Sequence, residues 1–154
     1  MLTQIIIAGL LITLTIALQA AVIGVNETLF NKFNRWLVRP PRIAKMVLAI
    51  TIVVLWIMVG ISISVWLWAR VYIWLGVFDS LEQSVYYSIV NLTTLGFGDI
   101  IIDEEWRVLA ALEAADGLIL FGLSTAYLME FISELRTSQR EYRDKKKRKT
   151  SVEN

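Results

Sequence analysis

The heptapeptide TTLGFGD occupies residues 93–99, between two segments that are long enough to cross a membrane. It places two glycines, an aromatic side chain and an acid close together in a chain that is 56% hydrophobic. A soluble domain is usually about 45–50% apolar. Glycine adopts positive φ angles at the least cost, so Gly96 and Gly98 predict an unusual backbone at this point of the chain.

Three long apolar segments, 1–25, 46–69 and 108–129, lie within the 154 residues. The first two carry no charge, and the third is interrupted only by Glu113 and Asp116. Each segment can cross a hydrocarbon core of about 30 Å at a rise of about 1.5 Å per residue. Segment 1–25 has no basic n-region and no cleavage box, so we expect a retained transmembrane helix instead of a signal peptide.

The basic residues predict the orientation of these spans. Five of the 15 lie in the linker 26–45 and eight in the tail 136–154, whereas Arg70 and Arg107 fall on the opposite side. By the positive-inside rule we expect the linker and the tail to be cytoplasmic, with the N-terminus and residues 71–106 outside. We expect a multi-pass protein of the plasma membrane, which is the inner membrane of the cell. Four aromatic residues fit an outer interfacial belt: Trp66, Trp68, Tyr72 and Trp74.

Residues 81–92 (LEQSVYYSIVNL) predict a short helix on the outer side. Ser80 and Gln83 have the spacing of a capping box, and Glu82 suits the positive N-terminal end of a helix dipole. Twelve residues rise only about 18 Å, which is too short to span the membrane. We therefore expect this helix to enter the membrane partway and return. Irregular backbone at that depth is allowed only where protein buries it or where it lines a watery cavity.

The segment that returns from the short helix, residues 93–98, could bind a dehydrated cation. An ion in a narrow pore exchanges its water for protein oxygens, and a ring of backbone carbonyls supplies these without a full charge. Gly96 and Gly98 permit the positive φ angles that such a backbone needs. Leu95 and Phe97 alternate with them and can point outward and pack, and Thr94 can add its hydroxyl at the inner end.

With these residues in view, the sequence TLGFGD at 94–99 resembles the selectivity filter of potassium channels, whose usual form is TVGYG followed by Asp. The resemblance runs from about residue 46 to 134 and implies a homotetramer, in which each chain contributes one filter strand. It implies K⁺ as the permeant ion, bound at residues 94–97, and no cofactor. The coordinating residues would act mainly through backbone carbonyls: Thr94, Leu95, Gly96, Phe97 and Gly98.

The same resemblance assigns Asp99 to the outer mouth and four residues to support of the filter: Thr93, Tyr86, Tyr87 and Asn91. The chain departs from the usual pattern in places. Leu95 replaces valine, Phe97 replaces tyrosine, and Val90 stands where some relatives carry a glutamate that partners the filter aspartate. These departures put the rigidity of the filter in doubt more than its selectivity.

The segments together predict an all-α membrane protein that assembles as a tetrameric channel, with three transmembrane helices, a re-entrant pore helix and a filter loop per chain. The expected divisions are an N-terminal transmembrane helix at 1–25, an amphipathic cytoplasmic linker helix at 26–45, a pore domain at 46–135 and a basic cytoplasmic tail at 136–154. Within the pore domain we expect an outer helix at 46–78, a pore helix at 80–92, the filter at 93–99 and an inner helix at 106–135.

Glu113 and Asp116 lie three residues apart on nearly one face of the inner helix. Charges inside a span are expensive and usually face a cavity or a partner. One interpretation is an acidic ring at the cavity that attracts cations. The other is structural, with one or both acids behind the pore helix and hydrogen-bonded to Asn91, Ser88 or a tyrosine. The resemblance places the gating glycine of the inner helix at Gly117, and Gly122 is a second flexible point and a possible hinge.

The chain has no histidine and no cysteine, and we find no nucleophile–base pair, so we do not expect an enzyme. No span carries the regular arginines of a voltage sensor. The basic linker and tail either bind anionic lipid or only fix orientation. The linker helix is expected to end near Pro40 and Pro41. A nucleic-acid partner is not expected. Two alternatives to a potassium channel stay open: a weakly selective monovalent cation channel and a non-conducting accessory membrane subunit.

Overall fold

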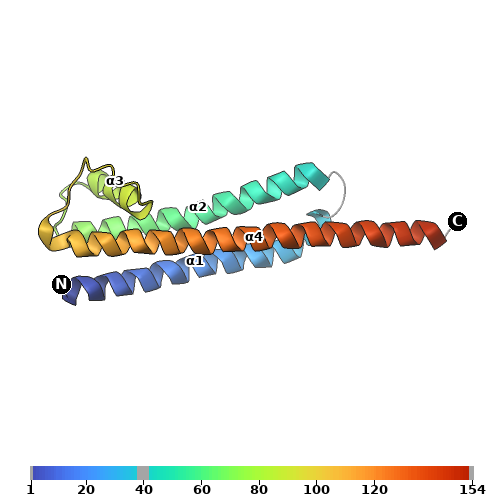
Figure 1. Ribbon diagram of the computed structural model, residues 1–154, viewed down its shortest axis with the longest axis horizontal. Coiled ribbons are helices and arrows are strands. Elements are labelled where there is room, and N and C mark those ends of the chain that lie inside the picture. The colour runs from blue at the N-terminus through green and yellow to red at the C-terminus, as the bar shows by residue number, and fades with distance from the viewer. Residues whose placement is uncertain (1, 38–41, 153–154) are drawn as a thin grey trace.

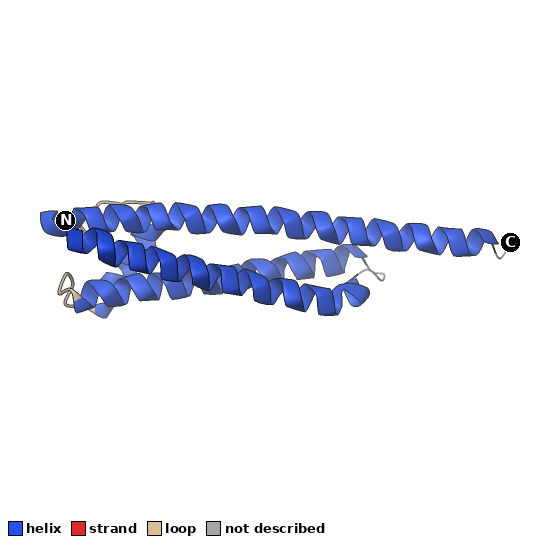
Figure 2. Cartoon of the chain, turned by 90° about the horizontal axis from the view of Figure 1, so that it is seen from below, coloured by secondary structure: helices blue, strands red, loops and turns tan. Residues whose placement is uncertain are grey.

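The computed structural model describes the backbone of residues 2–37 and 42–152 and the side chains of residues 2–30 and 43–143. Within these residues the helices are α1 (Leu2–Leu37), α2 (Arg42–Trp74), α3 (Leu81–Leu92) and α4 (Arg107–Val152). A 3-10 turn, η1 (Glu104–Trp106), directly precedes α4. The described residues contain no strand (Figure 2), so the predicted all-α fold is confirmed.

Three helices of the described chain are long and apolar enough to cross a membrane. They cover Leu2–Phe30, Ile43–Trp74 and Glu104–Arg143. A helix satisfies its own backbone N–H and C=O groups, which is the condition for crossing a hydrocarbon core. The remaining helix, α3, has only 12 residues. The chain is therefore a multi-pass membrane protein with the predicted pattern of three spans and one short helix.

Helices α1 and α4 run parallel, and α2 runs antiparallel to both (Figure 1). The contacts of α1 with η1 and α4 keep one register, because three residue pairs share a sequence separation of 101: Gln4 with Glu105, Thr15 with Asp116, and Phe30 with Phe131. Figure 1 places the N-terminus and α3 at one end of the molecule. The C-terminus and the helix ends that flank residues 38–41 lie toward the other end.

The first helix is longer than expected. We predicted a transmembrane helix that ends at residue 25 and a separate amphipathic helix over 26–45, but α1 continues without a break to Leu37. That prediction is wrong up to Leu37 because residues 26–37 contain neither proline nor glycine, and so nothing in the sequence ends the helix there. Pro40 and Pro41 lie outside the described residues. Likewise, α4 continues past 135 to Val152.

The second helix ends at Trp74, four residues before the predicted end at 78. Gly76 adopts a φ of 72°. Its N–H donates to the carbonyl oxygen of Ile73 (3.0 Å), and the N–H of Val77 donates to that of Tyr72 (3.0 Å). These two bonds define a Schellman motif, in which a residue with positive φ, usually glycine, closes a helix. The turn redirects the chain into α3.

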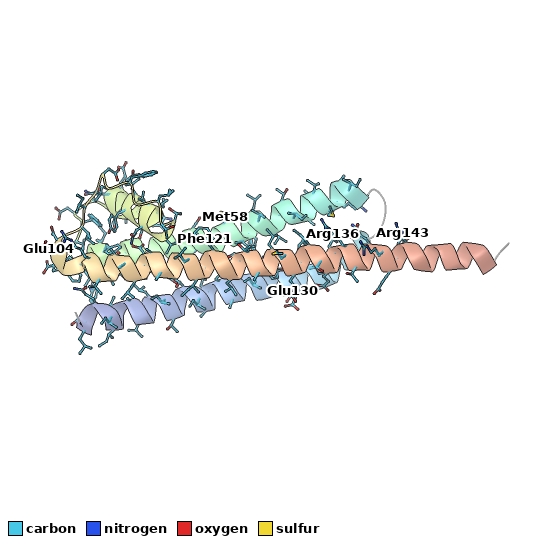
Figure 3. All side chains as sticks on the ribbon, viewed as in Figure 1. Met58, Glu104, Phe121, Glu130, Arg136 and Arg143 are labelled. Carbon is cyan, nitrogen blue, oxygen red and sulfur yellow. The ribbon has the colours of Figure 1, made fainter. Side chains whose placement is uncertain are left out.

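The short helix α3 packs between α2 and α4 at the end of the bundle that holds the N-terminus (Figure 3). Its start is close to the prediction, because Ser80 occupies the N-cap position, but the side chain of Ser80 makes no capping hydrogen bond. Instead, the hydroxyl of Ser84 donates to the carbonyl oxygen of Ala69 on α2 (2.8 Å). The predicted capping box is therefore wrong, and a bond to a neighbouring helix anchors the first turn of α3.

Candidate functional site

The chain leaves α3 through a tight turn. The N–H of Thr94 donates to the carbonyl oxygen of Asn91 at 2.9 Å. The N–H of Leu95 donates to the carbonyl oxygen of Val90 at 3.0 Å. These paired bonds form a second Schellman motif, whose left-handed position is usually a glycine. Here that position is Thr94, with a φ of 59°, which β-branched residues rarely adopt. No feature of the sequence indicated this conformation of Thr94.

Positive φ angles alternate along the predicted filter. Gly96 has a φ of 56° and Gly98 a φ of 76°, which confirms the predicted positive φ of the two glycines, and Thr94 extends the alternation by one step. The side chains of the intervening residues are largely uncovered in the single chain. Leu95 is 58% exposed and Phe97 65% exposed. An apolar loop of this kind needs a covering surface that one chain does not supply.

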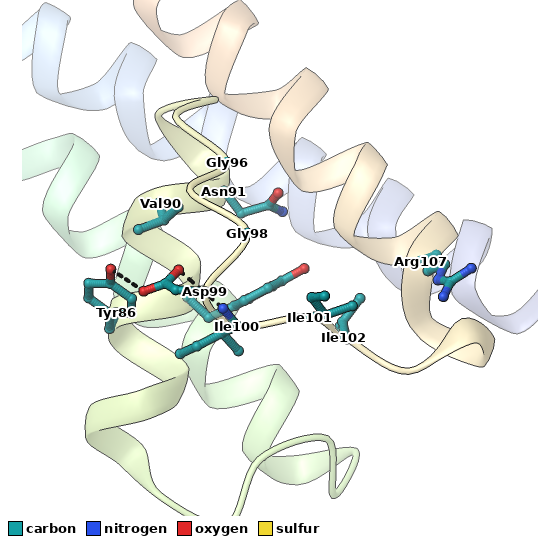
Figure 4. A pocket seen from close by; sticks show the side chains of 11 residues that line it. Tyr86, Val90, Asn91, Gly96, Gly98, Asp99, Ile100, Ile101, Ile102 and Arg107 are labelled. Carbon is teal, nitrogen blue, oxygen red and sulfur yellow. Dashed lines mark hydrogen bonds between the residues drawn. The ribbon is translucent and has the colours of Figure 1, made fainter.

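Asp99 is held at the end of this loop by two hydrogen bonds (Figure 4). The hydroxyl of Tyr86 donates to Oδ2 (2.6 Å), and the backbone N–H of Ile100 donates to Oδ1 (3.1 Å). The bond from Tyr86 lowers the pKa of Asp99, because it stabilises the ionised carboxylate. The same bond raises the pKa of Tyr86. Tyr86 thus partners the aspartate in a chain that has Val90 at the position of the glutamate of some relatives.

A cavity of about 230 Å³ lies beside the loop, as Figure 4 shows. Its lining comes from α3, the loop and the start of α4, and includes Tyr86, Asn91, Gly98, Asp99 and Arg107. Arg107 forms an ion pair with Glu104 (3.2 Å) in which both side chains are exposed. Exposed pairs of this kind contribute little to stability.

Two of the other predicted support residues, Tyr87 and Asn91, hold α3 against its neighbours, and Thr93 bonds back to α3 itself. The ring of Tyr87 meets that of Tyr72 edge to face at a centroid distance of 5.5 Å and that of Phe78 at 5.1 Å. The amide nitrogen of Asn91 donates to the carbonyl oxygen of Ala110 on α4 (2.7 Å). The hydroxyl of Thr93 donates to the carbonyl oxygen one turn back on α3 (2.6 Å). Tyr86, Tyr87 and Asn91 therefore line the cavity beside the loop, and Thr93 directly precedes Thr94.

Glu113 is fully buried between α2, α3 and α4. Its Oε1 accepts a hydrogen bond from the hydroxyl of Ser88 (2.5 Å). Its Oε2 accepts from the hydroxyl of Tyr72 (2.7 Å) and from the amide of Asn91 (2.8 Å). The structural interpretation of Glu113, with bonds to Asn91, Ser88 or a tyrosine, is confirmed by these contacts. Within the described chain the carboxylate faces donors and not an open cavity.

Asp116 is also fully buried, but it has different partners. The hydroxyl of Thr15 lies 3.0 Å from Oδ1 and 2.8 Å from Oδ2. The indole N–H of Trp68 donates to Oδ2 at 2.9 Å. Asp116 therefore links α1, α2 and α4, and its role in the single chain is structural as well. One turn further along, the amide of Gln19 donates to the hydroxyl of Ser124 (3.0 Å).

These contacts correct the predicted aromatic belt. Trp68 and Tyr72 are fully buried and donate to the two acids, whereas Trp66 and Trp74 are exposed as a belt requires. Tryptophan and tyrosine carry one polar group on a large apolar ring, so they suit a membrane interface and a buried acid equally well. The signal that separates the two cases was the pair of acids itself, because buried charges need partners.

The two predicted hinge glycines differ in their surroundings. A Cβ atom on Gly117 would lie 1.8 Å from the carbonyl oxygen of Leu92, the last residue of α3. A Cβ on Gly122 would meet nothing within 4 Å. Helix α4 runs as one helix through both positions. Gly117 thus permits close packing of α4 on the C-terminal end of α3, a role that the sequence did not indicate.

Several acids surround the loop at this end of the molecule. All are exposed in the chain: Asp79, Glu82, Asp99, Asp103, Glu104 and Glu105. Among the described residues, no group of three or more His, Cys, Asp or Glu side chains is arranged to hold a metal ion. These six exposed acids therefore define no metal site within the described residues.

The fold and the loop define a class: a three-span membrane protein with a short helix and a loop between its second and third spans. A family model described as an ion channel matches residues 61–134. Over these residues the chain is similar to ion channels, a family that is not an enzyme class, and the predicted resemblance to channel pore domains is confirmed. No curated protein and no solved structure matches the chain. The match includes α3, the loop and most of α4, and α1 lies outside it.

Proposed function

We propose that the protein is a potassium-selective channel that conducts K⁺ passively through a filter made by residues 94–98. The observation that carries this proposal is the alternation of positive φ at Thr94, Gly96 and Gly98, in a segment whose sequence resembles the potassium filter. Such a backbone lets carbonyl oxygens replace the water shell of an ion. Thr94, Leu95, Gly96 and Phe97 would bind the ion, and Asp99 would shape the outer mouth.

The proposed assembly is a homotetramer around a central pore. One chain carries one filter strand, and a ring of carbonyls needs several strands. The exposed apolar side chains of the single chain support the same assembly, because a large uncovered apolar surface marks an interaction site. Within the loop, Leu95 and Phe97 are exposed, and on α4 the side chain of Leu118 is 63% exposed. The filter is then a site that only four copies complete.

The proposed orientation follows from charge. The basic residues of the linker and tail are placed in the cytoplasm of the cell, and the N-terminus and the filter mouth outside. The exposed acids of the mouth would concentrate cations near the pore, an effect that salt screens. Anionic lipid is the proposed partner of the basic segments, because polybasic sequences next to spans attract it.

A reversal potential tests the function. Purified full-length protein is placed in a planar bilayer with K⁺ on one side and Na⁺ on the other. A potential that strongly favours K⁺, and that is lost in Gly96→Ala, is the expected result. Conductance with a potential near zero would instead support a weakly selective cation channel. Tetrameric protein that carries no current across voltage, pH and lipid would support the accessory subunit.

A further inference from the structure

The two buried acids of α4, Glu113 and Asp116, accept hydrogen bonds from different sets of helices. The donors to Glu113 come from α2 and α3, through Tyr72, Ser88 and Asn91. The donors to Asp116 come from α1 and α2, through Thr15 and Trp68. Although the acids are only three residues apart, Glu113 alone of the two binds the pore helix α3.

A continuous path of hydrogen bonds connects Glu113 with the filter. Its Oε2 accepts from the amide nitrogen of Asn91, the residue before the last of α3. The backbone carbonyl of Asn91 in turn accepts from the N–H of Thr94, the first residue of the filter. The same amide nitrogen also donates to the carbonyl oxygen of Ala110 on α4. Asn91 is thus fixed to the inner helix by its side chain and to the filter by its backbone.

The position of Thr94 is sensitive to this fixation. A threonine with a φ of 59° is in an unfavourable conformation, which persists only where the surrounding structure holds it. The two backbone bonds of the turn hold it from the α3 side, and these bonds are aligned only while the last turn of α3 stays in place. Glu113 holds that turn at Ser88 and Asn91.

We propose that Glu113 is a positioning residue that sets the ion specificity of the filter through Asn91, and that Asp116 does not share this role. The inference rests on the proposed function of the loop as a filter. A carboxylate accepts at both oxygens, which matches the three donors around Glu113. A glutamine at this position keeps the shape but not the charge: its N–H₂ group cannot accept from Ser88, whose hydroxyl must reverse to accept, and the bonds from Tyr72 and Asn91 lose their charge assistance. The hold of Glu113 on the last turn of α3 is thereby weakened.

The test compares permeability ratios of purified, full-length tetramers in planar bilayers under K⁺/Na⁺ and K⁺/Rb⁺ gradients. For Glu113→Gln we expect the K⁺ over Na⁺ ratio to fall by about tenfold, the size of change that replacing a hydrogen bond to a charged group by a neutral one can produce. The matched control is Asp116→Asn, the same chemical change three residues on, and it should keep the wild-type ratio. Tetramer assembly is checked for each variant by size-exclusion chromatography.

If Glu113→Gln does not assemble, substitutions of the donors around Glu113 test the same inference. Tyr72→Phe and Ser88→Ala each remove one donor and leave the carboxylate in place, and both should lower the K⁺ over Na⁺ ratio. Assembled variants with the wild-type ratio would overturn the inference, and so would an equal fall in Asp116→Asn. If the wild type itself shows no preference for K⁺, the proposed function fails. In that case the relative permeabilities of K⁺, Na⁺ and Rb⁺ still decide whether Glu113 positions the loop: they should differ between Glu113→Gln and the wild type, and equal values would overturn the inference.

Discussion

The hydroxyl of Thr15 donates to the carboxylate of Asp116 at a distance of 2.8 Å, across 101 residues of sequence. Both side chains are fully buried, although they lie within segments that are apolar enough to cross a membrane. The same separation of 101 residues joins Phe30 to Phe131, whose rings meet edge to face at 4.9 Å. The first helix, which lies outside the family match, therefore packs in one register along the inner helix of the pore unit.

Thr15→Val tests how much this contact stabilises the fold. Valine keeps the shape of threonine but removes the hydroxyl, so Asp116 keeps only the indole donor. We expect the free energy of unfolding to fall by about 0.5–1.5 kcal/mol, the range for buried polar contacts between membrane helices. Thermal unfolding of the purified protein in detergent measures the change, and the K⁺ over Na⁺ permeability ratio should stay unchanged.

Thr13→Val is the matched control for that experiment. Thr13 is exposed, and its hydroxyl donates to the carbonyl oxygen of Gly9 in its own helix (2.7 Å). The substitution should leave the unfolding temperature almost unchanged. Equal destabilisation by the two substitutions would show that the Thr15–Asp116 contact has no special role in joining α1 to α4.

Gly117→Ala tests whether this glycine serves packing or bending. A Cβ at this position would lie 1.8 Å from the carbonyl oxygen of Leu92, so α3 and α4 must separate. Overpacking of this kind costs about 1–3 kcal/mol, and backbone on the other side leaves little room to relax. We expect fewer assembled tetramers on size-exclusion chromatography, together with a lower unfolding temperature.

Gly122→Ala provides the comparison, because a Cβ there meets nothing within 4 Å in the chain. Alanine is favoured over glycine in a helix by up to about 1 kcal/mol. The variant should therefore assemble and unfold at the wild-type temperature or above. If Gly117→Ala instead assembles normally and changes only the open probability, the packing role is refuted and the hinge interpretation gains support.

The parts of the fold that could be predicted are those with local signals. Each of these signals lies in one continuous stretch of sequence and can be recognised without knowing the fold. They are the three apolar segments, the short helix, and the alternation of Gly96 and Gly98. The bonds of Glu113 were also among the predicted alternatives, because a buried acid behind a helix that carries Ser88 and Asn91 has few other donors.

The parts that could not be predicted depend on contacts between distant segments. Thr15 and Gln19 are two mildly polar residues in an apolar helix, and nothing near them in the sequence indicates Asp116 or Ser124 as partners. Trp68 was assigned to the membrane interface for the same reason, since its partner lies 48 residues away. The left-handed conformation of Thr94 was missed because it contradicts the preference of threonine and is fixed by its surroundings.

The bond between Tyr86 and Asp99 predicts how the outer mouth responds to acid. It lowers the pKa of Asp99, so its contribution is complete above the ordinary aspartate value, about 3.9, and is lost as pH falls through the lowered value. It raises the pKa of Tyr86, so the contribution is lost on the alkaline side only when pH rises through that raised value, above the ordinary tyrosine value of about 10. The contact between Tyr86 and Asp99 at the proposed mouth should therefore be insensitive to pH between these limits.

Tyr86→Phe removes the donor and should raise the pKa of Asp99 toward its ordinary value, so that protonation at the mouth begins at a higher pH. The current at fixed voltage in symmetrical K⁺, recorded while only the outer solution is acidified, measures this shift. Tyr87→Phe is the control, because the ring of Tyr87 packs against Tyr72 and Phe78 and the bond to Asp99 comes from Tyr86. It should keep the wild-type acid profile. An unshifted profile in Tyr86→Phe would mean that Asp99 holds its charge by other contacts, such as those to a neighbouring subunit, and that the bond to Tyr86 does not control the mouth.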